Sequence, residues 1–199
     1  MSTTERNFWL DALRANEGIG LVALGGQSYG GLLAQVILAQ RLDDVDRLIL
    51  SSTGPADFGP AWLPIEHVCI ALTRHLPEKF VKSLRVSRLL RMITLPEAER
   101  ADWQAAIEFV THDQPVRNDV VSHFAVAADM VRKRIVVPAA YGRWPGRIIV
   151  LRAENDPTQN PNDPPRYEKL LGRAIEVVNL GTLGHTAAIV DPDRYVSLM

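Results

Sequence analysis

A serine that could act as a nucleophile lies in a glycine-rich segment. Residues 25–31 read Gly-Gly-Gln-Ser-Tyr-Gly-Gly and contain the pattern G-x-S-x-G centred on Ser28. An apolar run precedes the segment and residues 32–41 follow with apolar side chains at helical spacing, so the predicted order is strand, sharp turn, helix. Such a turn lifts a serine hydroxyl above a sheet at strained backbone angles. The sequence predicts a nucleophilic Ser28, with Gly26 and Gly30 as the residues whose missing Cβ permits the turn.

A serine hydroxyl becomes a good nucleophile only when a base takes its proton, so a histidine is expected downstream. His185 lies in a loop that contains Gly181 and Gly184, directly after a predicted strand and before a predicted helix that begins near Asp191. Loops at the carboxyl ends of parallel strands are where catalytic groups collect in open α/β sheets. His185 is therefore the predicted base. The other histidines, which lie in a predicted helical region and are expected to have packing or surface roles, are His67, His75, His112 and His123.

An acidic residue is needed to orient the histidine. Asp156 follows the third predicted strand, at the same edge of the sheet, and is the predicted acid. Glu154 in the same loop is a rival, and Asp57 in the loop after the second predicted strand is a weaker one. Most aspartates in such loops only cap turns or helices. The choice of Asp156 rests on the chain order serine, aspartate, histidine.

The elements that must position these residues form an α/β pattern. Four short runs rich in Val, Ile and Leu are expected to be parallel strands covered on both faces, because most of them are apolar at successive positions. A helix over residues 29–41 and a short helix near residues 163–171 provide crossovers, and a further helix is predicted over residues 4–15. The four predicted strands are residues 19–24, 45–50, 147–151 and 174–180.

The pattern changes over residues 61–141. Several helical segments follow one another there without a convincing strand, which predicts an all-helical cap inserted between the second and third strands. Residues 1–60 and 142–199 then form the α/β core. Arg85, Arg88 and Arg91 lie in the inserted region, where we interpret them as a solvated face.

Composition limits the classes of function. The chain has 199 residues, 47% of them hydrophobic, and its 22 Lys plus Arg against 23 Asp plus Glu give a formal charge of -1. This balance does not favour binding to nucleic acid or to an anionic membrane, and small-molecule substrates fit better. The single cysteine, Cys69, cannot form an internal disulfide or a thiolate metal site. No cofactor or metal is expected, and the absence of an apolar signal segment predicts a cytoplasmic protein.

These residues together resemble the α/β-hydrolase superfamily, in its lid-bearing branch. The resemblance runs over almost the whole chain and rests on the turn Gly26-Gln27-Ser28-Tyr29-Gly30, the loop over residues 154–156 and the pair Gly184-His185. It implies a serine hydrolase of carboxylic esters or related acyl compounds that works through an acyl-enzyme. The resemblance assigns Ser28 as nucleophile, His185 as base and Asp156 as acid, with the backbone N–H of Tyr29 as an oxyanion donor.

Two departures from the family give further expectations. The family has several strands before the nucleophile and a His-Gly loop that supplies a second oxyanion donor, and nothing in residues 1–25 resembles them. We therefore expect a chain shortened at its N-terminus, with the strand over residues 19–24 as an exposed edge through which it self-associates or binds a complementing fragment. The alternative function is a catalytically impaired remnant, or half of a split hydrolase, that acts as a binding module.

Overall fold

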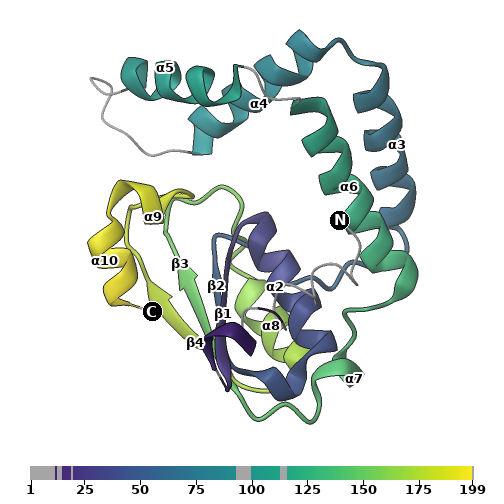
Figure 1. Cartoon of the computed structure of the whole chain (residues 1–199), viewed down its shortest axis with the longest axis vertical. Coiled ribbons are helices and arrows are strands. Elements are labelled where there is room, and N and C mark those ends of the chain that lie inside the picture. Colours follow the sequence, from purple (N-terminus) through teal and green to yellow (C-terminus); the bar gives the residue numbers. More distant parts are fainter. Residues whose placement is uncertain (1–11, 13–14, 19, 93–99, 113–115, 199) are drawn as a thin grey trace.

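The computed structural model describes residues 12, 15–18, 20–92, 100–112 and 116–198. Nearly all of the helix predicted over residues 4–15, and the first residue of the strand predicted over residues 19–24, lie outside these ranges. In the described part, four strands form one parallel sheet in the order β1-β2-β3-β4 (Figure 1). They are β1 (Val22–Gln27), β2 (Val45–Ser51), β3 (Arg147–Arg152) and β4 (Glu176–Asn179). The predicted α/β class, with four parallel strands flanked by helices, is confirmed.

Strand β1 differs from its prediction in position and burial. It starts at Val22 and continues through the glycine pair to Gln27, because Gly25 and Gly26 pair with Ile49 and Leu50 of β2. Backbone pairing, which side-chain propensity cannot reveal, therefore sets its end. Strand β1 also lies at an edge, and its residues alternate between partly buried and exposed over most of its length. The predicted burial on both faces holds for the interiors of the central strands β2 and β3.

Helices cover both faces of the sheet, and the alternation of side chains along the strands explains how. Leu48 and Leu50 of β2 pack with residues of α2 (Tyr29–Gln40) and α8 (Asp163–Leu171) on one face. Ile49 points the other way and packs in a second cluster with Ala187 of α9 (Ala187–Val190) and with Tyr195 of α10 (Pro192–Ser197). A short 3-10 helix, η1 (Leu42–Asp44), leads from α2 into β2.

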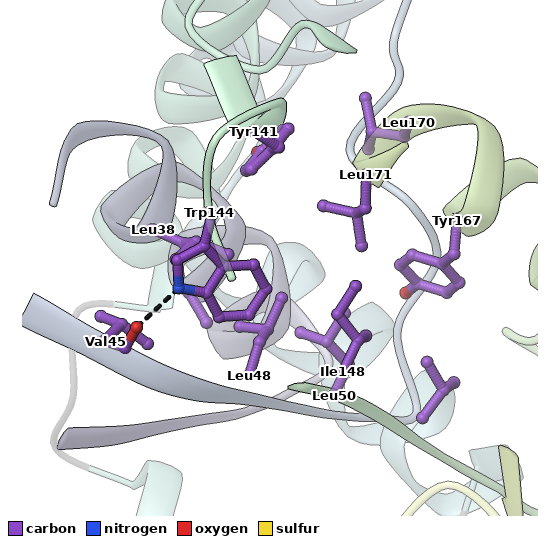
Figure 2. Close-up of a cluster of buried hydrophobic side chains, with 12 residues drawn as sticks. Leu38, Val45, Leu48, Leu50, Tyr141, Trp144, Ile148, Tyr167, Leu170 and Leu171 are labelled. Carbon is purple, nitrogen blue, oxygen red and sulfur yellow. Dashed lines mark hydrogen bonds between the residues drawn. The ribbon is translucent and has the colours of Figure 1, made fainter. Parts of the chain in front are cut away.

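Trp144 anchors the chain where it returns to the sheet. Its ring is fully buried among the apolar side chains of the first cluster, and its Nε1 donates a hydrogen bond of 2.6 Å to the carbonyl oxygen of Val45 (Figure 2). Gly146 lies close beneath it, because a Cβ there would come within 2.2 Å of the Trp144 ring. This contact fixes the point at which β3 begins.

Between β2 and β3 the described residues form helices joined by loops and contain no strand, which agrees with the helical prediction for residues 61–141. In Figure 1, α3 and α6 lie side by side, while α4 and α5 lie beyond the carboxyl ends of the strands. Within the described residues, no helix has the length and apolar character needed to cross a membrane. The helices of this insertion are α3 (Trp62–His75), α4 (Glu78–Met92), α5 (Arg100–Thr111), α6 (Val116–Lys133) and α7 (Pro138–Tyr141).

Candidate active site

Ser28 is the single residue between strand β1 and helix α2. Its backbone lies at φ 52° and ψ −122°, a conformation that is strained for a residue with a side chain. Two hydrogen bonds hold it there: the N–H of Ser28 donates to the carbonyl of Ser51 at 2.9 Å, and the carbonyl of Ser28 accepts from the N–H of Gly31 at 3.0 Å. The sharp strand-to-helix turn expected from the sequence is therefore present. Tyr29, the predicted oxyanion donor, is the first residue of α2.

The glycines around Ser28 do not share one steric role, in contrast to the sequence prediction. A Cβ on Gly26 would lie 2.3 Å from the carbonyl oxygen of Gly30, so a side chain at this position collides with backbone. A Cβ on Gly30 would meet no atom within 4 Å. The second tight position is Gly31, where a Cβ would lie 2.4 Å from the Cγ2 of Thr53. The close approach of α2 to the end of β1 requires Gly26, and the packing of α2 on the loop after β2 requires Gly31.

His185 and Asp156 lie together at the carboxyl edge of the sheet. The Nδ1 of His185 is 3.1 Å from Oδ1 of Asp156 and 3.3 Å from Oδ2, and both side chains are buried. Thr158 completes the cluster: its hydroxyl donates to Oδ1 of Asp156 at 2.7 Å and lies 2.9 Å from Nδ1 of His185. Because the one hydroxyl proton of Thr158 goes to the carboxylate, its oxygen is left to accept from Nδ1. This arrangement places the imidazole proton on Nδ1 and leaves Nε2 as the basic nitrogen.

The surroundings of Asp156 keep it ionised. Burial alone raises the pKa of a carboxyl group, but the hydrogen bonds from His185 and from the side chain and backbone N–H of Thr158 outweigh that effect. Together they lower the pKa of Asp156 from 3.8 to about 2. The group is therefore a carboxylate at any pH near neutrality, as the orientation of a histidine base requires. Thr158 was not identified from the sequence, although it lies two residues from the predicted acid.

The rival acids have other partners. Glu154 is exposed, and its carboxylate accepts a hydrogen bond of 2.9 Å from the side-chain amide of Asn179. Asp57 forms an ion pair with Arg166, whose Nε donates to its Oδ2 at 3.2 Å. Among the described residues, neither rival has a hydrogen bond to His185. The structure thus brings Asp156, and not these two residues, to the histidine.

His123 is the one other histidine that reaches this region in the described residues. Its ring lies on the ring of Tyr29, with a centroid distance of 4.2 Å, and it lines the same cavity as Ser28. Burial, with Arg88 and Arg85 nearby, lowers its pKa, and no carboxylate contacts it in the described part of the chain. It therefore lacks the acid partner of a general base. The remaining histidines are exposed and lie outside this cavity: His67, His75 and His112.

Backbone hydrogen bonds join the two loops that carry Asp156 and His185. The N–H of Leu180 donates to the carbonyl of Arg152 at 2.7 Å, and the N–H of Glu154 donates to the carbonyl of Gly181 at 2.8 Å. These bonds continue the pairing of β3 with β4 beyond the ends of the strands. As a result, the acid and the histidine are held by the sheet itself, which is a more rigid support than a free loop.

His185 is also bonded to the residue before the serine and to the helical insertion. The side-chain amide of Gln27 donates to the carbonyl of His185 at 2.6 Å, and the N–H of His185 donates to the carbonyl of Met92 at 3.3 Å. Gln27 is the last residue of β1 and Met92 is the last residue of α4. The histidine loop is therefore fixed from the serine side and from the insertion.

A cavity of about 600 Å³ joins Ser28 and His185 to the insertion. Within the described part of the chain, the hydroxyl of Ser28 makes no hydrogen bond to His185, although both line this cavity. Arg88 and Arg91 are exposed, as the predicted solvated face requires, but Arg85 is only partly exposed, and Arg85 and Arg88 also line this cavity. The other lining residues are Tyr29, Leu89, Met92, Asp119, Val120, Ser122, His123 and Phe124.

Comparisons with known proteins agree on the fold. The model of the alpha/beta hydrolase family matches residues 4–198. No curated protein sequence matches the chain. Among solved structures, the chain is similar to 2-hydroxy-6-oxo-6-phenylhexa-2,4-dienoate hydrolase from a Rhodococcus species, with 20% identity and a TM-score of 0.61 over 93% of this chain and 64% of the other.

Two further structures show the same fold. A thermophilic esterase from Thermogutta terrifontis is 18% identical, with a TM-score of 0.66 over 94% of this chain and 66% of the esterase. The enol-lactonase from Burkholderia xenovorans is 18% identical, with a TM-score of 0.62 over 93% of this chain and 66% of the lactonase. The chain thus spans about two thirds of the length of these structures. Because the family model covers nearly the whole chain, this protein belongs to the alpha/beta hydrolase family.

Proposed function

We propose that the chain is a serine hydrolase of carboxylic esters or related acyl compounds. One observation carries the proposal. Ser28, on a strained strand-to-helix turn, lines one cavity with His185, whose Nδ1 is held by the ionised Asp156 at 3.1 Å. A serine, a histidine with a free basic nitrogen and a buried carboxylate are the groups that acyl transfer to serine requires. Family membership and the hydrolases of similar fold support the proposal.

In the proposed reaction, the Oγ of Ser28 attacks the carbonyl carbon of the ester while Nε2 of His185 takes the hydroxyl proton. The tetrahedral oxyanion that forms accepts a hydrogen bond from the N–H of Tyr29, at the positive end of the α2 dipole. The bond between the carbonyl carbon and the alcohol oxygen then breaks, and His185 gives its proton to the departing alcohol. Water, activated by the same Nε2, attacks the acyl-enzyme and releases the acid, which restores Ser28.

We assign residues 61–141 as a lid over this site. Side chains from α4 and α6 line the cavity that contains Ser28, and the carbonyl of Met92 bonds the histidine loop. A lid excludes water from the reacting groups, which strengthens the electrostatic interactions between them. Residues 1–60 and 142–199 act as the core that carries the three reacting side chains.

The direct test of the proposal is labelling with a fluorophosphonate probe, which reacts with activated serines. We expect stoichiometric labelling of the native chain and none of the Ser28→Ala variant. Ser83→Ala, on the exposed surface of α4 and outside the cavity, is the matched control and should label normally. Labelling that persists in Ser28→Ala, or that is equally strong in heat-unfolded protein, would rule out Ser28 as the activated nucleophile.

A second candidate, a split hydrolase or impaired remnant that acts as a binding module, is favoured by the edge of the sheet. Among the residues that the structure describes, strand β1 pairs only with β2, and Ala23 and Gly25 on it are exposed. Leu21, directly before it, is 60% exposed. An apolar edge without Lys or Pro is open to addition of another strand. We therefore propose that the chain self-associates, or binds a complementing fragment, through the edge formed by residues 19–24.

The variant Leu21→Lys tests whether the chain associates through the edge at β1, as the second candidate function requires. We expect the native chain to elute in sizing chromatography as a species larger than a monomer, and the Leu21→Lys variant to elute as a monomer, because a lysine on an edge disfavours strand addition. Val177→Lys, at a 46% exposed position on the opposite edge strand β4, is the matched control and should behave like the native chain. A native chain that is monomeric and rapidly hydrolyses model esters in a Ser28-dependent manner would refute association through this edge.

A further inference from the structure

The wall of the cavity that faces Ser28 carries more positive than negative charge. Four residues of α4, at spacings of three and four, point into it: Arg85, Arg88, Leu89 and Met92. Asp119 of α6 lies across from them and accepts a hydrogen bond of 3.1 Å from Arg85. Arg85 and Asp119 therefore neutralise each other within the cavity.

Arg88 keeps its charge uncompensated. In the described part of the chain it makes no hydrogen bond or ion pair with a side chain, although it lines the cavity with Ser28. The ring of His123 packs on the ring of Tyr29, next to the serine. Burial, and then the charges of Arg88 and Arg85, lower the pKa of His123, so this histidine is neutral at pH 7. Apart from His185, the described lining residues leave one net positive charge in the cavity that contains Ser28.

Apart from Ser122, the rest of the lining is apolar. Leu89 and Met92 of α4, Val120 and Phe124 of α6, and the ring of Tyr29 complete the wall. A surface of this kind accommodates hydrocarbon between a reacting carbonyl at Ser28 and a charged group at Arg88. One net cation matches one negative charge, and a planar guanidinium binds a carboxylate through two parallel hydrogen bonds.

From this arrangement, and resting on the proposed function, we propose that the site prefers esters that carry one free carboxylate, and that Arg88 binds this carboxylate. Arg88 is then a specificity-determining residue. Arg85 does not compete for the substrate, because it is engaged with Asp119.

The test compares esters that differ only in charge. One pair is an aryl monoester of glutaric acid and its methyl-capped neutral counterpart, and the other is acetylated hydroxybenzoate and its methyl ester. We expect the native chain to show a higher kcat/KM for the anionic member of at least one pair. Arg88 is exposed, so the ratio of anionic to neutral kcat/KM should fall about 5- to 10-fold in Arg88→Gln, the size expected for a charge-assisted hydrogen bond at the cavity surface.

Two matched variants sharpen this test. Arg91→Gln removes a cation from the exposed surface of the same helix, outside the cavity, and should leave the ratio unchanged. Asp119→Asn removes the negative charge that neutralises Arg85 and should raise the ratio about twofold to threefold. Ratios that are the same in Arg88→Gln and in the native chain, for both pairs, would overturn the proposal.

A binding measurement separates this inference from the proposed reaction. In the Ser28→Ala background, calorimetric titration with monomethyl glutarate should show binding that is weakened about 5- to 10-fold by Arg88→Gln, and dimethyl glutarate should bind more weakly than the monoanion. If ester hydrolysis is absent but this Arg88-dependent binding is found, the anion site stands and the hydrolase function fails. If hydrolysis depends on Ser28 but the monoanion binds no better than the diester, the hydrolase function stands and the anion site fails.

Discussion

Replacing Asp156 by asparagine is expected to lower kcat/KM for ester hydrolysis roughly a thousand- to ten-thousand-fold. An asparagine amide can present its N–H to Nδ1 of His185, which favours the tautomer with the proton on Nε2. That tautomer cannot accept the proton of Ser28. The loss should therefore fall on kcat more than on KM, because the cavity that binds the substrate is unchanged. Steady-state kinetics with an aryl ester measures it.

The control for this prediction is the neighbouring carboxylate. Glu154→Gln changes an exposed residue that is bonded to Asn179, and its kcat/KM should stay within about twofold of the native value. If Glu154→Gln caused the large loss and Asp156→Asn did not, the assignment of the acid would be wrong.

The same variant also has an expected effect on the acid stability of the fold. The pKa of Asp156 is lower in the folded chain, about 2, than its ordinary value of 3.8, so its carboxylate stabilises the folded state above pH 3.8. This stabilisation, about 2 kcal/mol, is lost as the pH falls from 3.8 towards 2. Denaturant unfolding of Asp156→Asn should therefore show a weaker decline of the free energy of unfolding in this pH range than the native chain.

Gly26→Ala is expected to lower the free energy of unfolding by about 3 kcal/mol. The added Cβ would lie 2.3 Å from the oxygen and 2.5 Å from the carbon of the Gly30 carbonyl, and 2.7 Å from the nitrogen of Gly31. All three atoms belong to backbone, so no side-chain rotation relieves the contact and the first turn of α2 must move. For a chain of this size, the melting temperature should fall by roughly 6–12 °C.

Gly30→Ala is the matched control, and its effect should have the opposite sign. A Cβ there meets nothing within 4 Å, and alanine is favoured over glycine in a helix by up to about 1 kcal/mol. Thermal unfolding of the two variants side by side decides the point. Equal losses of stability in both variants would show that α2 lies at another distance from the end of β1.

Much of this fold could be predicted from the sequence, because local patterns determine it. The runs of β2 and β3 are apolar at successive positions, and the predicted ranges lie within one residue of the observed strands. Ser28 and the pair of His185 and Asp156 lie in short loops whose type and chain order were visible in the sequence. Their common edge follows from parallel pairing, which brings the carboxyl ends of all strands together.

Other features depend on long-range packing and could not be predicted. Arg88 and His123 belong to helices whose faces are set only when α4 and α6 pack over the sheet, so sequence periodicity could not distinguish a cavity wall from a solvated face. Thr158 acts through hydrogen bonds to Asp156 in its own loop and to His185, which a separate loop brings to it. The end of β1 depends on its pairing with β2. Gly26 and Gly30 have unequal roles because a Cβ added at Gly26 would point into the backbone of α2, whereas one added at Gly30 would point into open space.

The bond between the N–H of His185 and the carbonyl of Met92 ties the backbone of the histidine to the position of α4. Met92 ends α4, which is a wall of the cavity, and this bond is one of two backbone restraints on His185, the other being the bond from the Gln27 side chain to its carbonyl. Loss of such a bond costs about 1 kcal/mol. The backbone of His185 is therefore held most firmly when α4 lies over the cavity, so the wall of the cavity also helps to orient the imidazole.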